Sequence, residues 1–176
     1  MSIEAIYLDS IKKRMLTYKV LGDKTLERLD EQQLHWQPDE HSNSIYQVVK
    51  HVSGNMLSRW TDFLTSDGEK PWRNRDGEFE EAQASKADII AMWEKGWSCM
   101  LQTFDSLQPG DLEKTITIRS EPLIAIDAIN RQLAHIPHHV GQIVYIGKML
   151  LKDKWESLSI PKGGSDAFNQ QMTGKK

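Results

Sequence analysis

Residues 126–150 read IDAINRQLAHIPHHVGQIVYIGKML, and this stretch decides the fold. Its apolar residues recur at intervals of three and four, the spacing that places side chains on one face of an α-helix. They are Ile126, Ile129, Leu133, Ile136, Val140, Ile143, Gly147 and Leu150. A helix of this length with a single apolar face has to bury that face against other helices, so the stretch predicts one member of a helix bundle.

Three earlier segments show the same helical spacing. They are Ile3 to about Leu29, about Ile45 to Leu64, and a segment that begins at Ser85 and ends before Gln108-Pro109-Gly110. Side chains suited to capping precede the second of these at Ser42–Ser44, and the turn formers of Asp67–Gly77 predict a loop after it. We therefore predict an all-α fold, a four-helix bundle.

Two regions depart from the helical pattern. Thr115–Ile118 alternates polar and β-branched residues, as a short strand would, so a small β-hairpin is expected before the last long helix. After Trp155 the glycines and Pro161 predict an extended C-terminal tail. With 176 residues and no internal repeat, the chain is expected to form a single domain over residues 1–176.

Composition excludes several classes of partner. The formal net charge is −3, and Lys and Arg alternate with Asp and Glu instead of forming a basic stripe, so we expect no nucleic-acid partner. No stretch approaches the roughly 18–20 apolar residues of a membrane span, and charges interrupt the apolar runs near the N-terminus. We expect no membrane partner and a cytoplasmic location. The single Cys99 agrees with a reducing compartment without proving one.

Histidines are the residues that point to chemistry. His135 and His139 stand four residues apart, so both imidazoles lie on one face of the last helix. His51 lies midway along the second helix, beside its apolar face. Three imidazoles that converge in a bundle suit zinc, nickel or iron(II) and leave positions open for water or substrate. Histidines that are only half-buried and hydrogen-bonded remain the alternative at this point.

Polar residues flank these histidines on the same helices. Arg131 and Gln142 continue the face of the paired histidines, while Gln47, Asn55 and Ser58 flank His51. A metal-bound imidazole needs an acceptor for its outer N–H, and Gln142, Asn55 and Asp127 are the candidates. His138 lies about 100° from His139 around the helix and is expected outside the ligand set. His35 and His41 precede the second helix and show no partner pattern.

Two motifs resemble a known superfamily. HIPHHVGQI at residues 135–143 resembles the His-x-x-x-His-x-Gly-Gln signature of the DinB-like (YfiT-like) proteins. LHWQP at 34–38, followed by NSI at 43–45 and then His51, is similar to that superfamily's approach to its first histidine ligand. The resemblance implies a four-helix bundle, a divalent metal ion, most readily zinc or nickel, on His51, His135 and His139, and a homodimer.

The resemblance also implies a class of reaction. Better-studied members are thiol-dependent transferases and isomerases, which implies an S-transferase acting on a small-molecule substrate with a bacillithiol-type thiol as cosubstrate. Arg59, Arg73 and Arg75 could then hold carboxylates of the thiol, although Arg73 and Arg75 are better explained as surface charges or loop salt bridges. The same site could instead activate water for hydrolysis, or the chain could be a non-catalytic stress protein with a structural metal.

Overall fold

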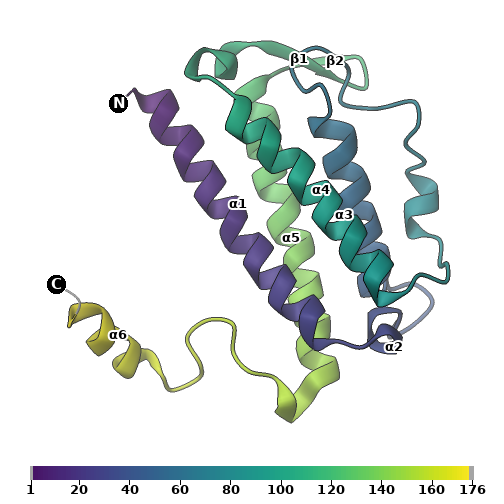
Figure 1. Ribbon diagram of the computed structural model, residues 1–176, viewed down its shortest axis with the longest axis vertical. Coiled ribbons are helices and arrows are strands. Elements are labelled where there is room, and N and C mark those ends of the chain that lie inside the picture. Colours follow the sequence, from purple (N-terminus) through teal and green to yellow (C-terminus); the bar gives the residue numbers. More distant parts are fainter. Residues whose placement is uncertain (1, 175–176) are drawn as a thin grey trace.

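The structure is a computed structural model and describes residues 2–174. Four long helices form an all-α bundle, and a two-stranded hairpin precedes the last of them (Figure 1). The helices are α1 (Ile3–Arg28), α2 (Glu31–Leu34), α3 (Ile45–Trp60), α4 (Lys86–Ser106), α5 (Ala125–Leu151) and α6 (Ser165–Thr173). Short 3₁₀ turns are η1 (Asp76–Phe79), η2 (Pro109–Glu113) and η3 (Lys152–Lys154). The predicted bundle and hairpin are confirmed.

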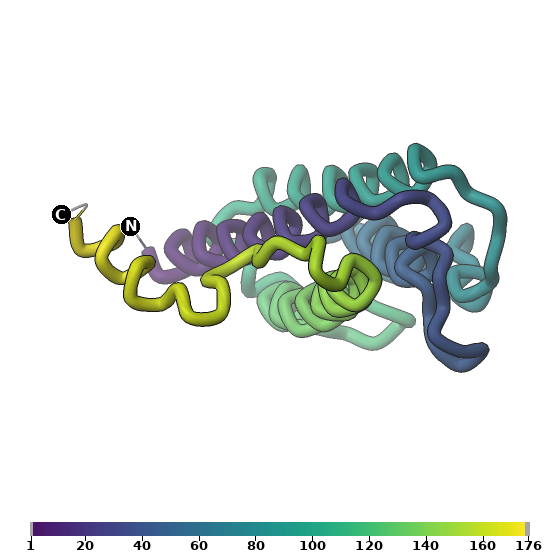
Figure 2. Tube along the Cα trace, turned by 90° about the horizontal axis from the view of Figure 1, so that it is seen from below, coloured from purple at the N-terminus to yellow at the C-terminus, as the bar shows by residue number. Residues whose placement is uncertain are grey.

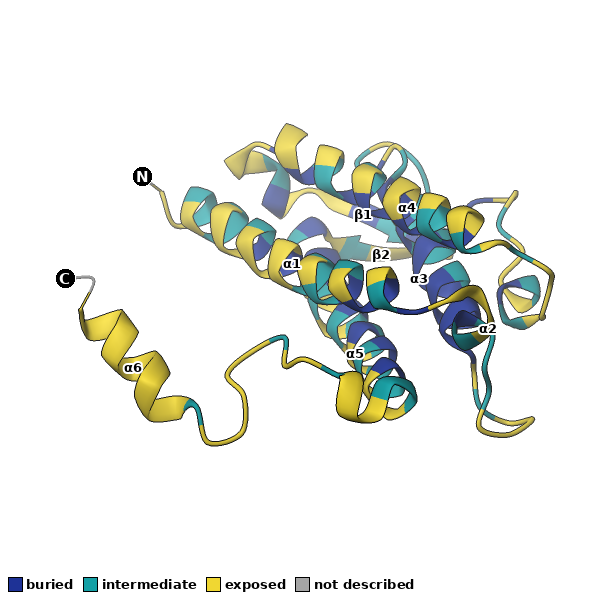
Figure 3. Ribbon diagram, turned by 60° about the horizontal axis from the view of Figure 1, so that its bottom comes forward, coloured by how far each residue is buried: buried dark blue, intermediate teal, exposed yellow. Residues whose placement is uncertain are grey.

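The four long helices pack as two pairs. α1 packs mainly against α5, and α3 packs mainly against α4. Contacts of α3 with α5 and of α1 with α4 close the bundle. The buried residues, dark blue in Figure 3, lie on the helix sides that face the interior. Within residues 2–174, no helix combines the length and the apolarity needed to cross a membrane.

Capping side chains define where the helices begin. Ser44 accepts a hydrogen bond from the backbone N–H of Gln47, whose side chain in turn accepts from the N–H of Ser44. Ser85 and Asp88 form the same reciprocal box at the start of α4. Such a box satisfies two backbone donors that the first turn of a helix leaves free.

The second long helix ends four residues earlier than its apolar pattern suggests. α3 stops at Trp60, because Thr61 is extended and Asp62 adopts a positive φ of 50°, which an α-helix cannot accommodate. Phe63 is nevertheless buried in the core. The apolar periodicity therefore continued past the true end of the helix, since a turn can bury a side chain as well as a helix can.

The hairpin is tied to the loop that follows α3. Strands β1 (Thr115–Ile118) and β2 (Glu121–Ile124) pair antiparallel, with Ile118 opposite Glu121. The turn residues Arg119 and Ser120 have positive φ, and their backbone N–H groups donate to the Asp67 carboxylate at 2.8 and 2.7 Å. These two hydrogen bonds hold the loop and the hairpin together at one end of the bundle.

Two short helices were not expected. α2 is a single turn closed by a capping box between Asp30 and Gln33, too short for any periodicity to reveal. The tail is irregular from Trp155 to Gly164, as predicted, but Ser165–Thr173 then forms α6 instead of continuing extended. Every residue of α6 is exposed, and Figures 1 and 2 draw it outside the bundle. The helix therefore forms from local sequence preference without packing against the bundle. The sequence pattern did not predict it, because the glycines and Pro161 before it indicated an extended tail.

Candidate metal centre

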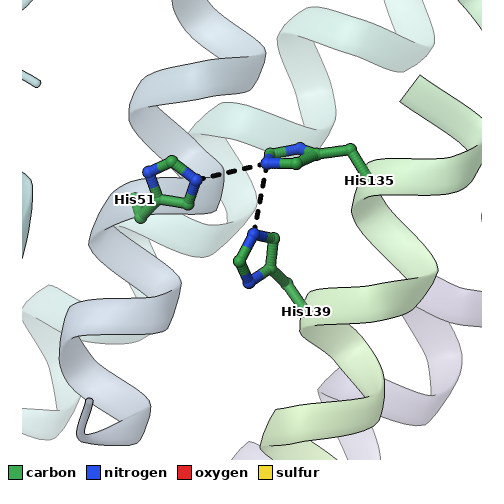
Figure 4. Close-up of side chains that lie close together, drawn as sticks. All are labelled: His51, His135 and His139. Atoms are coloured by element: carbon green, nitrogen blue, oxygen red, sulfur yellow. Dashed lines mark hydrogen bonds between the residues drawn. The ribbon is translucent and has the colours of Figure 1, made fainter. Parts of the chain in front are cut away.

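Three histidines from two helices meet in the bundle (Figure 4). His51 comes from α3, and His135 and His139 come from consecutive turns of α5. The Nε2 atom of His135 lies 3.2 Å from the Nε2 of His51 and 3.2 Å from the Nε2 of His139. One ligand atom from each of the three residues lies within 4.8 Å of the others, close enough for a single metal ion.

The outer nitrogen of His51 is held by a buried ion pair. Its Nδ1 lies 2.9 Å from Oε2 of Glu78, and Arg73 donates to Glu78 through Nε at 2.7 Å and Nη2 at 2.9 Å. Burial alone would raise the pKa of Glu78, but the hydrogen bonds from His51 and Arg73 outweigh it and lower that pKa. A carboxylate in this position accepts Nδ1–H, which leaves the Nε2 lone pair facing the other histidines.

His139 is fixed in the same way by an uncharged acceptor. Its Nδ1 lies 2.8 Å from Oε1 of Gln142, one of the residues that the sequence named for this role. Burial lowers the pKa of His139, and the hydrogen bond that its ring donates to Gln142 only partly offsets that effect. His139 is therefore a neutral imidazole near pH 7, again with its Nε2 lone pair directed toward His135.

His135 completes the cluster and is the most perturbed of the three. Burial and the neighbouring His139 and His51 lower its pKa to about 3. Its Nδ1 is buried and has no hydrogen-bond partner in the described part of the chain. A neutral His135 carries one proton, so its Nε2–H can satisfy at most one of the two lone pairs that face it. A cation at the centre would satisfy all three nitrogens, and the donor set thus fits a divalent ion of the zinc or nickel type.

A cavity of about 520 Å³ opens beside the histidines. His51 and His135 form part of its wall, so one side of the cluster faces open space. Five arginines also line it, and no aspartate or glutamate is among the lining residues. The polar and charged lining residues are His51, Asn55, Arg59, Arg73, Arg75, Arg119, Arg131, Gln132, His135 and His138.

Most of the predicted flanking residues lie at the site, though not always in the expected role. Asn55, Arg59 and Arg131 line the cavity. Asn55 does not support a histidine, because its Oδ1 is buried and accepts no hydrogen bond from any residue between 2 and 174. Arg59 is tied to the loop, donating to the Gly68 carbonyl and to Glu69. His138 is exposed and outside the converging set, as its position on the helix predicts.

Other predicted positions have structural roles. Asp127 is exposed and forms no hydrogen bond to a histidine within the described residues. Gln47 caps α3, and Ser58 donates to the Gly68 carbonyl at 2.7 Å. His35 contacts the Ala84 carbonyl and Glu81, away from the cluster, and His41 is exposed.

Sequence reasoning missed Glu78 and the buried state of Arg73. Glu78 lies in η1, just past the expected loop of Asp67–Gly77, in a segment crowded with acidic residues. The only local signal is Gly54 in α3, where an added Cβ would lie 2.2 Å from Oε1 of Glu78. Arg73 was expected at the surface or in a loop salt bridge. It does form the salt bridge, but its side chain is only 2% exposed.

Comparison with known proteins gives one match. The sequence model of a family described as "Protein of unknown function (DUF1572)" matches residues 2–164, which includes the bundle, the hairpin and all three histidines. No curated protein and no solved structure gives a significant match.

Proposed function

We propose that this chain, a member of the DUF1572 family, is a metal-dependent enzyme. The proposal is drawn from its own side chains, with one divalent ion bound by His51, His135 and His139. The observation that carries this proposal is the convergence of three Nε2 atoms whose outer nitrogens are held by Glu78 and Gln142. Outer acceptors of this kind orient imidazole ligands and raise their basicity. The bundle, the hairpin and this donor set support membership of the DinB-like superfamily.

The position of the cluster favours catalysis over a purely structural ion. A structural zinc site is closed by four protein ligands, whereas a catalytic site keeps a position open. Three histidines converge here, and among the described residues no cysteine or carboxylate joins them as a fourth ligand. The open side faces the 520 Å³ cavity, which is large enough for a small organic substrate.

The reaction that we propose is transfer of an organic group to a thiol. The thiolate sulfur forms a bond to an electrophilic carbon of the substrate, and the leaving group departs with the electron pair of the bond that breaks. A bound divalent ion would lower the pKa of a thiol and present it as a thiolate. The thiol has to come from a cosubstrate of the bacillithiol or glutathione type, because Cys99 lies on α4 beside Thr61 and does not line the cavity. The protein's own contribution is to orient the three imidazoles and to bind the cosubstrate in the cavity.

Hydrolysis is the weaker candidate. Activation of water at such a site usually requires a carboxylate that accepts the proton. No carboxylate lines the cavity, and Glu78 already accepts hydrogen bonds from His51 and Arg73. A cytoplasmic homodimer remains part of the proposal, and light scattering at micromolar concentration tests the dimer.

Elemental analysis of tag-free protein tests the metal site. We expect about one divalent ion per chain, and loss of most of it in His51→Ala, His135→Ala and His139→Ala. His138→Ala is the matched control and should retain the ion, since it is a histidine on the same helix whose ring lies outside the converging set. If the parent takes up neither zinc nor nickel, the proposal is wrong.

A cobalt-substituted protein tests the thiol reaction. Glutathione or bacillithiol should produce a sulfur-to-cobalt charge-transfer band, whereas S-methylglutathione, which cannot form a thiolate, should not. If both thiols leave the spectrum unchanged in protein that holds cobalt, thiol transfer is excluded and the metal site stands.

A further inference from the structure

The cavity beside the histidines carries an excess of positive charge. Arg59 and Arg119 pair with Glu69, and Arg73 pairs with Glu78. Arg75 and Arg131 also line the cavity, and within residues 2–174 neither has a carboxylate within 4.0 Å. Three of the five guanidinium groups share two carboxylates, and the other two, Arg75 and Arg131, are exposed and available to bind a ligand.

Buried donors without partners point to the same ligand chemistry. Nη1 of Arg73 and Nε2 of Gln132 are buried and have no hydrogen-bond partner among the residues that the structure describes, and both residues line the cavity. Oε1 of Glu69 lies 3.9 Å from Nη1, beyond hydrogen-bond distance. Buried donors without acceptors are costly, and a charged donor is the most costly kind. Within residues 2–174 the chain places no oxygen acceptor within hydrogen-bond distance of either donor, so a ligand with oxygen acceptors can supply what is missing.

We infer that the cavity binds a small organic anion through a carboxylate or phosphate group. Nη1 of Arg73 and Nε2 of Gln132 donate to its oxygens, and the exposed Arg75 and Arg131 neutralise its charge. Guanidinium groups suit this purpose because their N–H pairs match the oxygens of carboxylate and phosphate. A neutral ligand would leave these charges uncompensated in a cavity without acidic side chains.

The anion site and the histidines together define the substrate. A molecule whose anionic end lies against the arginines would present its other end to His51 and His135 on the same cavity wall. This inference rests on the proposed function for its chemical purpose, because the histidines supply the reactive centre. Binding of the anion itself needs no metal ion, so the two can be tested separately.

Isothermal titration of the metal-free, full-length protein at low ionic strength tests the anion site. Succinate and inorganic phosphate are the probes, and succinamide is the neutral control for succinate. We expect succinate or phosphate to bind and succinamide to bind at least tenfold more weakly. The stronger of the two anions identifies the group as carboxylate or phosphate.

Variants locate the site. Arg131→Gln and Arg75→Gln should each weaken anion binding by about fivefold to tenfold, since each removes one guanidinium that lines the cavity. Neither arginine forms an ion pair within residues 2–174, and the contact of Arg75 with the Phe79 ring, 5.9 Å from its centroid, is too weak to decide whether the protein folds. Arg14→Gln removes the same charge from the exposed face of α1 and should change binding by less than twofold. Gln132→Leu should also weaken binding, and a melting temperature close to that of the parent would show that it remains folded.

The outcomes separate this inference from the proposed function. Equal binding of succinate and succinamide, or unchanged binding in the Arg75→Gln/Arg131→Gln double variant, overturns the anion site. If the protein holds zinc but binds neither anion, the inference fails and the metal site stands. If it binds an anion but takes up no metal, the inference stands and the proposed function fails.

Discussion

Nδ1 of His51 lies 2.9 Å from Oε2 of Glu78, so a residue of the loop between α3 and α4 orients a histidine at the centre of the bundle. Both side chains are 7% exposed, and Phe79 stacks on the His51 ring with centroids 4.9 Å apart. The loop is therefore part of the site and not only a connection between helices. Its contribution can be measured without altering any of the three histidines.

Replacing the charge of Glu78 should weaken metal binding. Glu78→Gln keeps the shape of the side chain but removes the carboxylate that accepts from His51, and loss of such an outer partner lowers metal affinity about 10-fold to 100-fold. Competition with a chromophoric chelator measures the zinc affinity. Glu80→Gln, a neighbour outside the site, should leave it unchanged. Equal affinities in the two variants would show that Glu78 does not act on the metal.

Removing Glu78 altogether should destabilise the metal-free protein. Glu78→Ala leaves the guanidinium of Arg73, whose side chain is 2% exposed, without its hydrogen-bonded partner. Breaking one side of a buried ion pair lowers the free energy of unfolding by about 3–5 kcal/mol. Urea denaturation measures the loss, and the double variant Arg73→Met/Glu78→Leu should recover part of it. A double variant less stable than Glu78→Ala would contradict this explanation.

Close packing of α3 and α4 depends on Gly96. An added Cβ would lie 2.8 Å from the Cα of Ser53, a backbone atom that cannot move without shifting the helix. Gly96→Ala should therefore reduce stability by about 1–3 kcal/mol in thermal or urea unfolding. Gly141 in α5 is the control, because a Cβ added there would have nothing within 4 Å. Gly141→Ala should raise stability by about 0.5–1 kcal/mol, and a loss there would be unexpected.

Acid should destabilise the metal-free protein through His135. In the folded state its pKa is about 3, mainly because burial disfavours the charged ring, whereas an unfolded chain has a value of 6.5. The unfolded state thus binds a proton that the folded state does not, and stability falls as pH drops from about 6.5 toward 3.

The contribution of His135 is at most about 1.4 kcal/mol per pH unit, and solvent screening reduces it because the ring is only partly buried. Urea unfolding at pH 7 and pH 5 should show a smaller difference for His135→Gln than for the parent. Identical differences would rule out His135 as a source of acid sensitivity.

Helix α6 should contribute nothing to the stability of an isolated chain. All nine of its residues are exposed, including Phe168 and Met172. A chain that ends at Gly164 should melt within about 2 °C of the full chain, because removal of exposed residues changes stability little. A larger decrease that depends on protein concentration would mean that α6 packs against a second copy.

The parts of the fold that could be predicted are the helices, whose residue types recur at a regular spacing along the chain. Apolar residues at helical spacing identified α1, α3, α4 and α5, and the spacing of His135 and His139 placed them on one face. The contact of Gln142 with His139 could be predicted for the same reason, since the two residues lie one turn apart on a regular helix. In each case the geometry of a single helix fixes the relationship.

The parts that could not be predicted depend on how irregular segments fold back on the bundle. Glu78 reaches His51 because the loop after α3 crosses that helix at Gly54, and a single glycine in a helix does not reveal which residue packs against it. The end of α3 was missed because Phe63 is buried from a turn. The burial of Arg73 was missed because its partner, Glu78, was itself not recognised.

Because the bundle consists of two helix pairs, a metal ion bound by the three histidines would join one pair to the other. His51 belongs to the α3–α4 pair, and His135 and His139 belong to the α1–α5 pair, so a bound ion would cross-link the two halves at their seam. At a free metal concentration about 100 times the dissociation constant, such a cross-link adds about 2.7 kcal/mol to the free energy of unfolding. Amide protons at the seam would then exchange only when the bundle opens as a whole, whereas without the ion the pairs are free to separate first.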